Sequence, residues 1–139
     1  MNKILPALCI IFGAIILLAA YAWLGAGSQV LGTKSFGMFL TVGDKLGFNI
    51  DSNAVYFGKS IQGSFAKRDL LVSNNFSEKV LVDIEKSGDL GAWVEPDLKE
   101  FYLEGGETKT ITLLATIPPD AKKADYNGLV TVYYIKAHN

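Results

Sequence analysis

Carboxylates are the commonest side chains in this sequence that could do chemistry. They gather in two stretches, which hold Asp83, Glu85 and Asp89, and then Glu95, Asp97, Glu100 and Glu104. Such oxygens can ligate calcium, and a pair of them across a cleft can hydrolyse a glycosidic bond. No D-x-D-x-D-G loop or similarly dense spacing is present, however. We therefore expect solvated carboxylates, with no metal, no cofactor and no catalytic residue.

The remaining residue counts exclude other classes of chemistry. The 139 residues include one cysteine, Cys9, and one histidine, His138. Nucleophilic triads and most zinc sites require more of these side chains. With 13 basic residues, 14 acidic residues and a net charge of −1, the chain also lacks the positive field of a nucleic-acid binder. We expect neither an enzyme nor a nucleic-acid partner.

Two motifs mark surface positions. The triplet Asn75-Phe76-Ser77 is an N-x-S acceptor for an N-linked glycan in a predicted turn. Tyr133 and Tyr134 lie in the last predicted strand, where neighbouring side chains point to opposite faces. One of the two tyrosines should therefore lie on an outer face, where it would be available to a partner.

The first segment has the composition of a membrane anchor. Residues 4–26 carry no charge, and a helix of this length spans roughly 34 Å, enough for a hydrocarbon core of about 30 Å. Tyr21 and Trp23 are placed as interfacial aromatics, and Lys3 should stay in the cytoplasm. We expect a single span over residues 1–26, with everything beyond it extracytoplasmic at the cell membrane.

A cleaved secretory signal is the alternative for this segment. Ala20-Tyr21-Ala22 and Ala26-Gly27-Ser28 both offer small residues at the spacing that a signal peptidase accepts. The protein would then be secreted. The apolar run is longer than the core of about 7 to 15 residues that is usual for a signal, which favours the anchor.

Beyond the anchor, the sequence predicts an all-β domain. The Gly- and Ser-rich residues 27–37 are expected to be a short flexible stalk, and residues 38–139 an antiparallel β-sandwich ectodomain. Short apolar or alternating runs are separated by Gly, Asn, Asp and Pro, and no helical period persists. The expected strands are 38–42, 46–50, 54–57, 65–73, 79–86, 91–94, 98–103, 108–117 and 126–136.

Alternation also predicts which side chains form the core. In the strand at 108–117, Ile111, Leu113 and Ile117 should face inward. The hydroxyl of Tyr126 should bond back to the preceding turn near Asp120 or Ala121. The other expected core residues are Phe39, Phe48, Val55, Phe57, Leu71, Val80, Val82, Ile84, Trp93, Leu98, Phe101, Leu103, Tyr126, Leu129 and Val132.

Two stretches resemble immunoglobulin-like domains. The run AVYFGKSIQGSFAKRDLLVSNN resembles the opening of domains of the major-sperm-protein and pilus-chaperone type, through Phe57-Gly58, Gly63, Arg68 and Asn74. Residues 93–134 are similar to the alpha-galactosidase-associated modules of archaeal and bacterial envelope proteins, through Leu103, Gly106-Glu107, Pro119-Asp120-Ala121 and Tyr126-Asn127-Gly128. The resemblance implies the fold and leaves the function open, because such modules serve as spacers, adhesins, chaperones and polymer subunits.

The expected function is a structural or protein-interaction role at the cell surface. The partners would be other envelope proteins or further copies of the chain, together with the membrane itself. The alternative is a subunit or stator-like accessory part of a cell-surface filament or envelope assembly, in which strand edges and sheet faces carry the contacts.

Overall fold

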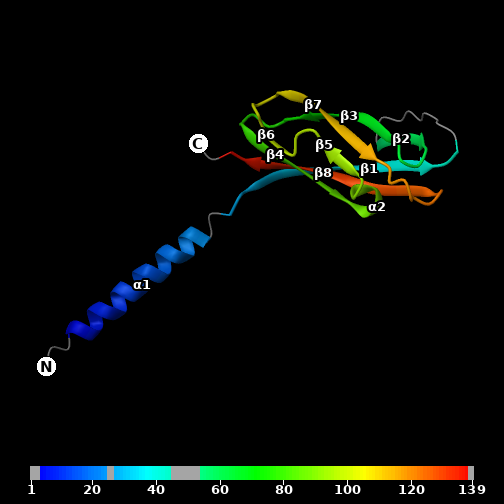
Figure 1. Ribbon diagram of the computed structural model, residues 1–139. Helices are drawn as coiled ribbons and strands as arrows, with labels where there is room; N and C mark the ends of the chain where they lie inside the picture. Colours follow the sequence, from blue (N-terminus) through cyan, green and yellow to red (C-terminus); the bar gives the residue numbers. More distant parts are fainter. Residues whose placement is uncertain (1–3, 25–26, 45–53, 138–139) are drawn as a thin grey trace.

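One helix, a short second helix and eight strands make up the described part of the chain (Figure 1). The computed structural model describes residues 4–24, 27–44 and 54–137. The elements are α1 (Ile4–Leu24), β1 (Val30–Val42), β2 (Ala54–Ser60), β3 (Phe65–Ser73), β4 (Val80–Ser87), α2 (Gly88–Gly91), β5 (Val94–Pro96), β6 (Glu100–Leu103), β7 (Thr108–Thr116) and β8 (Asp125–Lys136).

Helix α1 extends away from the strands (Figure 1). Pro6 lies in its first turn, where the missing N–H has no helical acceptor to lose. Large apolar side chains on several sides of the helix are exposed, including Ile11, Phe12, Leu17 and Tyr21. Across residues 4–24, 27–44 and 54–137, no helix is both long enough and apolar enough to cross a membrane. The membrane span stays a prediction.

The strands form two sheets that enclose a common apolar core, so the predicted all-β sandwich is confirmed. The five-stranded sheet has the order β2-β1-β8-β4-β6, and the three-stranded sheet has the order β3-β7-β5. Most neighbouring strands are antiparallel, but β1 and β2 are parallel, which the expectation of antiparallel sheets missed. The strands β7 and β8 follow each other in sequence and lie in different sheets.

The core contains most of the predicted residues. Ile111, Leu113 and Ile117 are buried, while Thr108, Thr110 and Thr116 on the same strand are exposed. Val80, Val82 and Ile84 of β4 alternate into the core in the same way. Strict polar and apolar alternation therefore identified the inward face correctly wherever it was present.

Four predicted core residues are exposed instead, namely Phe39, Leu71, Leu98 and Leu129. Three of them lie beside apolar neighbours that are buried in their place: Met38 and Leu40 beside Phe39, Leu70 and Val72 beside Leu71, and Val130 beside Leu129. Successive apolar residues fit either face of a strand, so the pattern does not fix which set points inward. Phe48 and the predicted strand 46–50 lie outside the described residues.

The prediction of a flexible stalk is wrong for residues 30–37, which belong to β1. From Val30 onward this strand is paired with β8, from Ile135 back to Asp125. The backbone hydrogen bonds to β8 override the weak strand propensity of glycine and serine. Gly32 also has a packing role, because a Cβ placed there would lie 3.0 Å from Cζ of Phe76.

The predicted strand 91–94 is also displaced. Residues 88–91 form α2, and β5 begins only at Val94. Gly88 has a positive φ of 80°, and a Cβ on it would lie 2.8 Å from the Cα of Gly128 in β8. This close approach of two glycines lets α2 pack against β8, and it is visible in the sequence only as two separate glycines.

Candidate functional site

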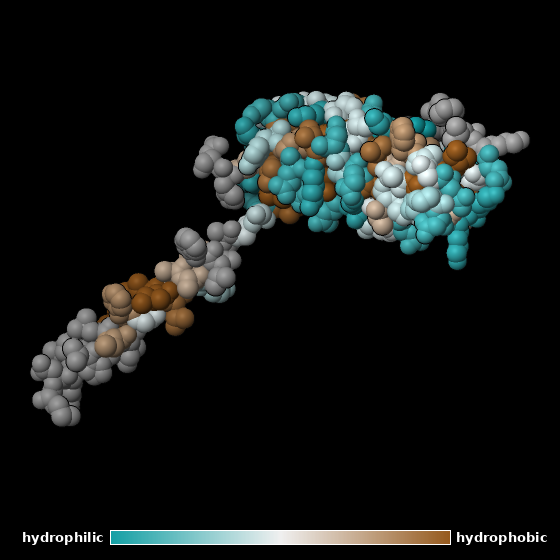
Figure 2. Space-filling model, in the orientation of Figure 1, coloured by the Kyte–Doolittle hydropathy of each residue, from teal (hydrophilic) through white to brown (hydrophobic). Residues whose placement is uncertain are grey.

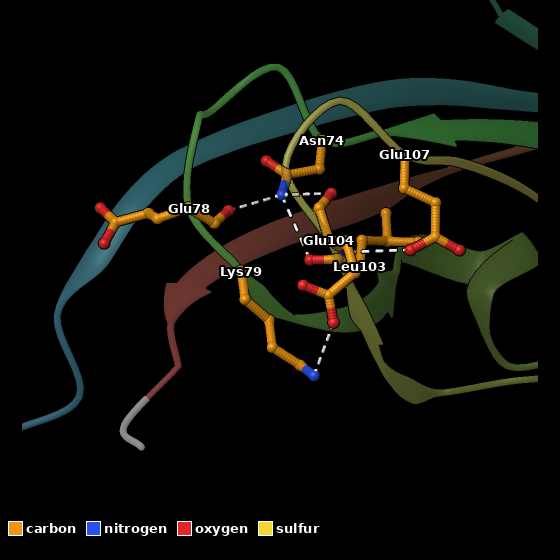
Figure 3. Close-up of polar contacts among 6 residues, drawn as sticks. All are labelled: Asn74, Glu78, Lys79, Leu103, Glu104 and Glu107. Atoms are coloured by element: carbon orange, nitrogen blue, oxygen red, sulfur yellow. Dashed lines mark hydrogen bonds and ion pairs between the residues drawn. The ribbon is translucent and has the colours of Figure 1, made fainter.

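Asn74 fixes the end of the sandwich where the predicted glycan acceptor lies. Its side chain is fully buried, and Nδ2 donates to the carbonyl oxygens of Glu78 at 2.8 Å, Leu103 at 3.2 Å and Glu104 at 3.0 Å (Figure 3). Its Oδ1 accepts a hydrogen bond from the backbone N–H of Phe76 at 3.0 Å. One buried amide thus joins the β3–β4 loop to the β6–β7 turn.

Charged groups close the same junction at the surface. Lys79 pairs with Glu104 at 2.7 Å, and the Glu107 carboxylate accepts a hydrogen bond from the backbone N–H of Glu104 at 2.8 Å (Figure 3). The hydrogen bond and the charge of Glu104 raise the pKa of Lys79 above its ordinary value. Both groups are well exposed, so this ion pair contributes little to the stability of the fold.

Asn75 is exposed directly beside the buried Asn74. Phe76 turns inward, where its ring meets that of Tyr134 with centroids 6.0 Å apart. Ser77 is exposed again. The acceptor asparagine and the serine of the N-x-S triplet are therefore both on the surface, and glycosylation of Asn75 stays a prediction.

Tyr133 and Tyr134 face opposite sides of β8, as alternation requires. Tyr134 is 7% exposed and belongs to the core, and this burial raises the pKa of its phenol. Tyr133 is half-buried on the outer side of the five-stranded sheet. Of the two candidate contact residues, only Tyr133 is placed to meet a partner.

Tyr21 and Trp23 were the predicted membrane-interface residues. Tyr21 on α1 is exposed, and the side chain of Trp23 is not among the described side chains.

Tyr126 forms a tyrosine corner at the start of β8. Its hydroxyl donates to the carbonyl oxygen of Lys122 at 2.9 Å, so the predicted bond to the preceding turn is present, one residue beyond Ala121. The ring packs against Trp93 with centroids 4.4 Å apart. Both rings are half-buried at the edge of the core, which makes this contact a structural one.

The Tyr126 hydroxyl allows a direct test. We expect Tyr126→Phe to lower the free energy of unfolding by about 1 kcal/mol, the usual net value of one hydrogen bond. Tyr133→Phe is the matched control, since no hydrogen bond of its hydroxyl is among the described contacts, and it should change stability by less than about 0.5 kcal/mol. Urea unfolding of both variants measures the difference, and equal values would contradict this role for Tyr126.

The outer face of the five-stranded sheet carries two apolar groups. At the end near α1, Val30, Leu81 and Ile135 lie in one cross-strand row, which Tyr102 continues on β6. The second group, which follows further along β1 and β8, is made of Phe39, Tyr56 and Leu129. The rings of Phe39 and Tyr56 stack with centroids 5.1 Å apart, and a Cβ on Gly37 would lie 2.9 Å from the Phe39 ring.

Between these groups lies a row that contains opposed carboxylates. Asp83 on β4 is directly opposite Glu100 on β6 and, on its other side, Tyr133 on β8. Oδ1 of Asp83 is buried and, within the described residues, has no hydrogen-bond partner. The sequence placed Asp83 and Glu100 in separate acidic stretches, and only the strand register brings them together.

The other predicted carboxylates are dispersed. Glu95 pairs with Lys86, Asp97 accepts a hydrogen bond from the backbone N–H of Thr112 at 3.0 Å, and Glu104 pairs with Lys79. In the parts of the chain that the structure describes, no group of three or more His, Cys, Asp or Glu side chains could hold a metal ion. The solvated acidic side chains expected from the sequence account for most of these positions.

Arg68 and Asn74 are polar residues whose roles were missed. The Arg68 guanidinium on β3 donates to the carbonyl oxygens of Tyr56 at 2.6 Å and Phe57 at 3.3 Å, which ties the two sheets together beside β2. Both residues lie in the run that resembles the opening of immunoglobulin-like domains. Neither follows an apolar period, so the sequence does not show which distant carbonyl groups each of them reaches.

Comparisons with known proteins do not assign the chain to a family. No protein-family model matches the chain, and the searches of curated proteins and of solved structures gave no match either. The resemblance to immunoglobulin-like domains of envelope proteins therefore stays an expectation based on the quoted motifs.

Proposed function

We propose that this protein is an interaction module, in which a β-sandwich carried by an apolar helix binds another protein through the outer face of its five-stranded sheet. The observation that carries this proposal is the exposure of large apolar side chains on that face. Phe39 is 43% exposed, Leu129 48%, Val30 52% and Tyr102 57%. Aromatic and aliphatic groups that lie together on one face are typical of protein contact surfaces.

We further propose that the sandwich is immunoglobulin-like. Strands β3, β4, β7 and β8 would correspond to B, C, E and F, because β3 pairs with β7 in one sheet and β4 with β8 in the other. The tyrosine corner at Tyr126 is at the start of the proposed strand F, where such corners occur. Strand β1 then holds the position of G beside F, although it comes first among the strands.

The helix is proposed to anchor the module in the cell membrane, with the sandwich on the extracytoplasmic side. Support comes from the absence of charge in residues 4–26 and from the exposed apolar side chains on several sides of α1, those of one face being visible in Figure 2. A helix that is apolar all round needs an apolar environment. Lys3, before the apolar run, favours a cytoplasmic amino terminus.

Site-specific photo-cross-linking in cells tests the proposed function. A photoreactive phenylalanine derivative would replace Leu129 on the outer face of the five-stranded sheet in the tagged full-length protein. The control position is Asp120, which is exposed in the turn after β7. We expect discrete adducts from position 129 in the membrane fraction and far fewer from position 120. Absence of adducts from position 129, or equal yields at both, would overturn the proposal.

A role as a subunit of a cell-surface assembly is the second candidate. Strand β1 supports it, because it leads from the segment after α1 into the five-stranded sheet, where β8 pairs with it along most of its length and β2 flanks its second half. An anchor that continues into an interior strand suits a part that must transmit load. In the same experiment, a ladder of the protein linked to itself would favour this candidate, whereas links to a different protein would favour an accessory module.

A further inference from the structure

We infer that the row around Asp83 on the outer face of the five-stranded sheet docks a basic, extended segment of a partner protein. The surface consists of the cross-strand row of Asp83, Glu100 and Tyr133 together with Tyr102, which lies beside this row on β6, and we call it the acidic row. The inference rests on the proposed function and adds to it the place of contact and the chemistry of the partner.

Charge complementarity is the first argument. The outer face of β4, β6 and β8 carries Asp83, Glu85, Glu100 and Asp125, and no lysine or arginine of these strands shares it. Lys79 contacts the Tyr102 ring, with Nζ 5.5 Å from the centroid, but it is already paired with Glu104. Asp83, Glu85 and Glu100 form no ion pair within the described residues. A cationic partner would supply the missing charge.

The state of Asp83 is the second argument. Like charges directly opposite each other on neighbouring strands destabilise a sheet, and Asp83 faces Glu100 in this way. A guanidinium or ammonium group from a bound segment would offset the repulsion between these two carboxylates.

The position of β6 is the third argument. This strand is the last in the order of the five-stranded sheet, so an added strand can pair with its outer edge. Glu100 and Tyr102 are exposed on it, while Phe101 and Leu103 point into the core. An extended segment along β6 would place alternate side chains beside Glu100 and Tyr102. A second copy is disfavoured, because symmetric contact would bring acidic row against acidic row.

The test uses the purified full-length chain in non-ionic detergent and two synthetic peptides. One peptide is Thr-Arg-Val-Arg-Val-Arg-Thr with a fluorescent label, and the other has glutamate in place of each arginine. We expect the arginine peptide to bind and the glutamate peptide not to bind. The variant Asp83→Asn/Glu100→Gln should weaken binding by about tenfold or more, because it removes both charges and keeps the shapes of the side chains.

A matched variant controls for net charge. Asp89→Asn/Asp120→Asn removes the same two charges from exposed positions away from this face, and it should change the affinity by less than about twofold. Thermal unfolding separates docking from a structural role. Asp83→Asn should raise the melting temperature, because it ends the opposition of like charges to Glu100.

Three results would overturn the inference: no binding of the arginine peptide, equal loss of affinity in both double variants, or a fall in melting temperature for Asp83→Asn. Each of these is distinguishable from failure of the proposed function. If adducts still form from position 129 in cells while the peptide experiment fails, the outer face binds a partner of other chemistry. If no adducts form in cells, the proposed function itself fails.

Discussion

A chain that begins at Ser28 should keep the stability of the full-length sandwich, whereas one that begins at Gly37 should lose most of it. The second chain lacks Val30–Phe36, which pair with β8 between Ile135 and Val130. Leu31 and Phe36 also pack against the core. Removal of a Leu or Phe from such a position costs about 2–5 kcal/mol, and the whole domain has only about 5–15 kcal/mol to lose.

Circular dichroism and urea unfolding of the two shortened chains and of the full-length protein measure this difference. The chain from Ser28 serves as the control, since it lacks α1 and keeps all of β1. We expect it to unfold cooperatively, and the chain from Gly37 to unfold at a much lower urea concentration or to be unfolded without urea. Equal midpoints for the two shortened chains would show that the first half of β1 is as dispensable as a flexible stalk.

Asn74→Ala should be the most damaging single substitution at the end of the sandwich where the β3–β4 loop meets the β6–β7 turn. It removes the donor for three carbonyl oxygens and the acceptor for the Phe76 N–H. Each buried group left without a partner costs about 1–3 kcal/mol, so we expect a loss of about 3 kcal/mol or more. The adjacent Asn75→Ala, at an exposed position, should change stability by less than about 0.5 kcal/mol.

Asn74→Asp refines this test because it keeps the shape and removes the donor. An ionised carboxylate would face three carbonyl oxygens, so its pKa should be raised in the folded variant. The destabilisation should therefore be largest at neutral pH and should shrink as the pH falls through that raised pKa, where the protonated acid can donate again. Urea unfolding across pH measures this, and a deficit that is the same at every pH would contradict the donor role of Asn74.

The fold was predictable where the sequence pattern allowed only one interpretation. The alternation of threonine and aliphatic residues in β7 identified Ile111 and Leu113 as core, and Tyr126 was correctly expected to bond back to its preceding turn. The sequence was ambiguous where apolar residues follow each other, as at Phe39 and Leu129, because either parity fits a strand. In β1, pairing with β8 outweighed local composition, so Gly32 lies in a strand and not in a stalk.

The candidate site was less predictable than the fold. The sequence predicted that one of Tyr133 and Tyr134 faces outward, because neighbouring side chains in a strand face opposite ways, but it did not show which one. The opposition of Asp83 and Glu100 depends on the register between β4 and β6, and Asn74 reaches carbonyl groups about 30 residues away in the sequence. Such contacts between distant segments leave no local pattern from which they could be read.

The position of β1 between β2 and β8 determines how the module would respond to mechanical force. A pull transmitted through α1 enters at Val30, and the carboxyl end of β8 lies at the same end of the sheet, where the N–H of Lys136 donates to the carbonyl oxygen of Gln29. A tether near this end would peel β1 from β8 one pair at a time. A tether at the far end, near Tyr56, would load β1 in shear between β2 and β8, so that many hydrogen bonds resist together. The attachment point of a partner on the sheet would therefore decide whether the sandwich yields gradually or holds until it ruptures.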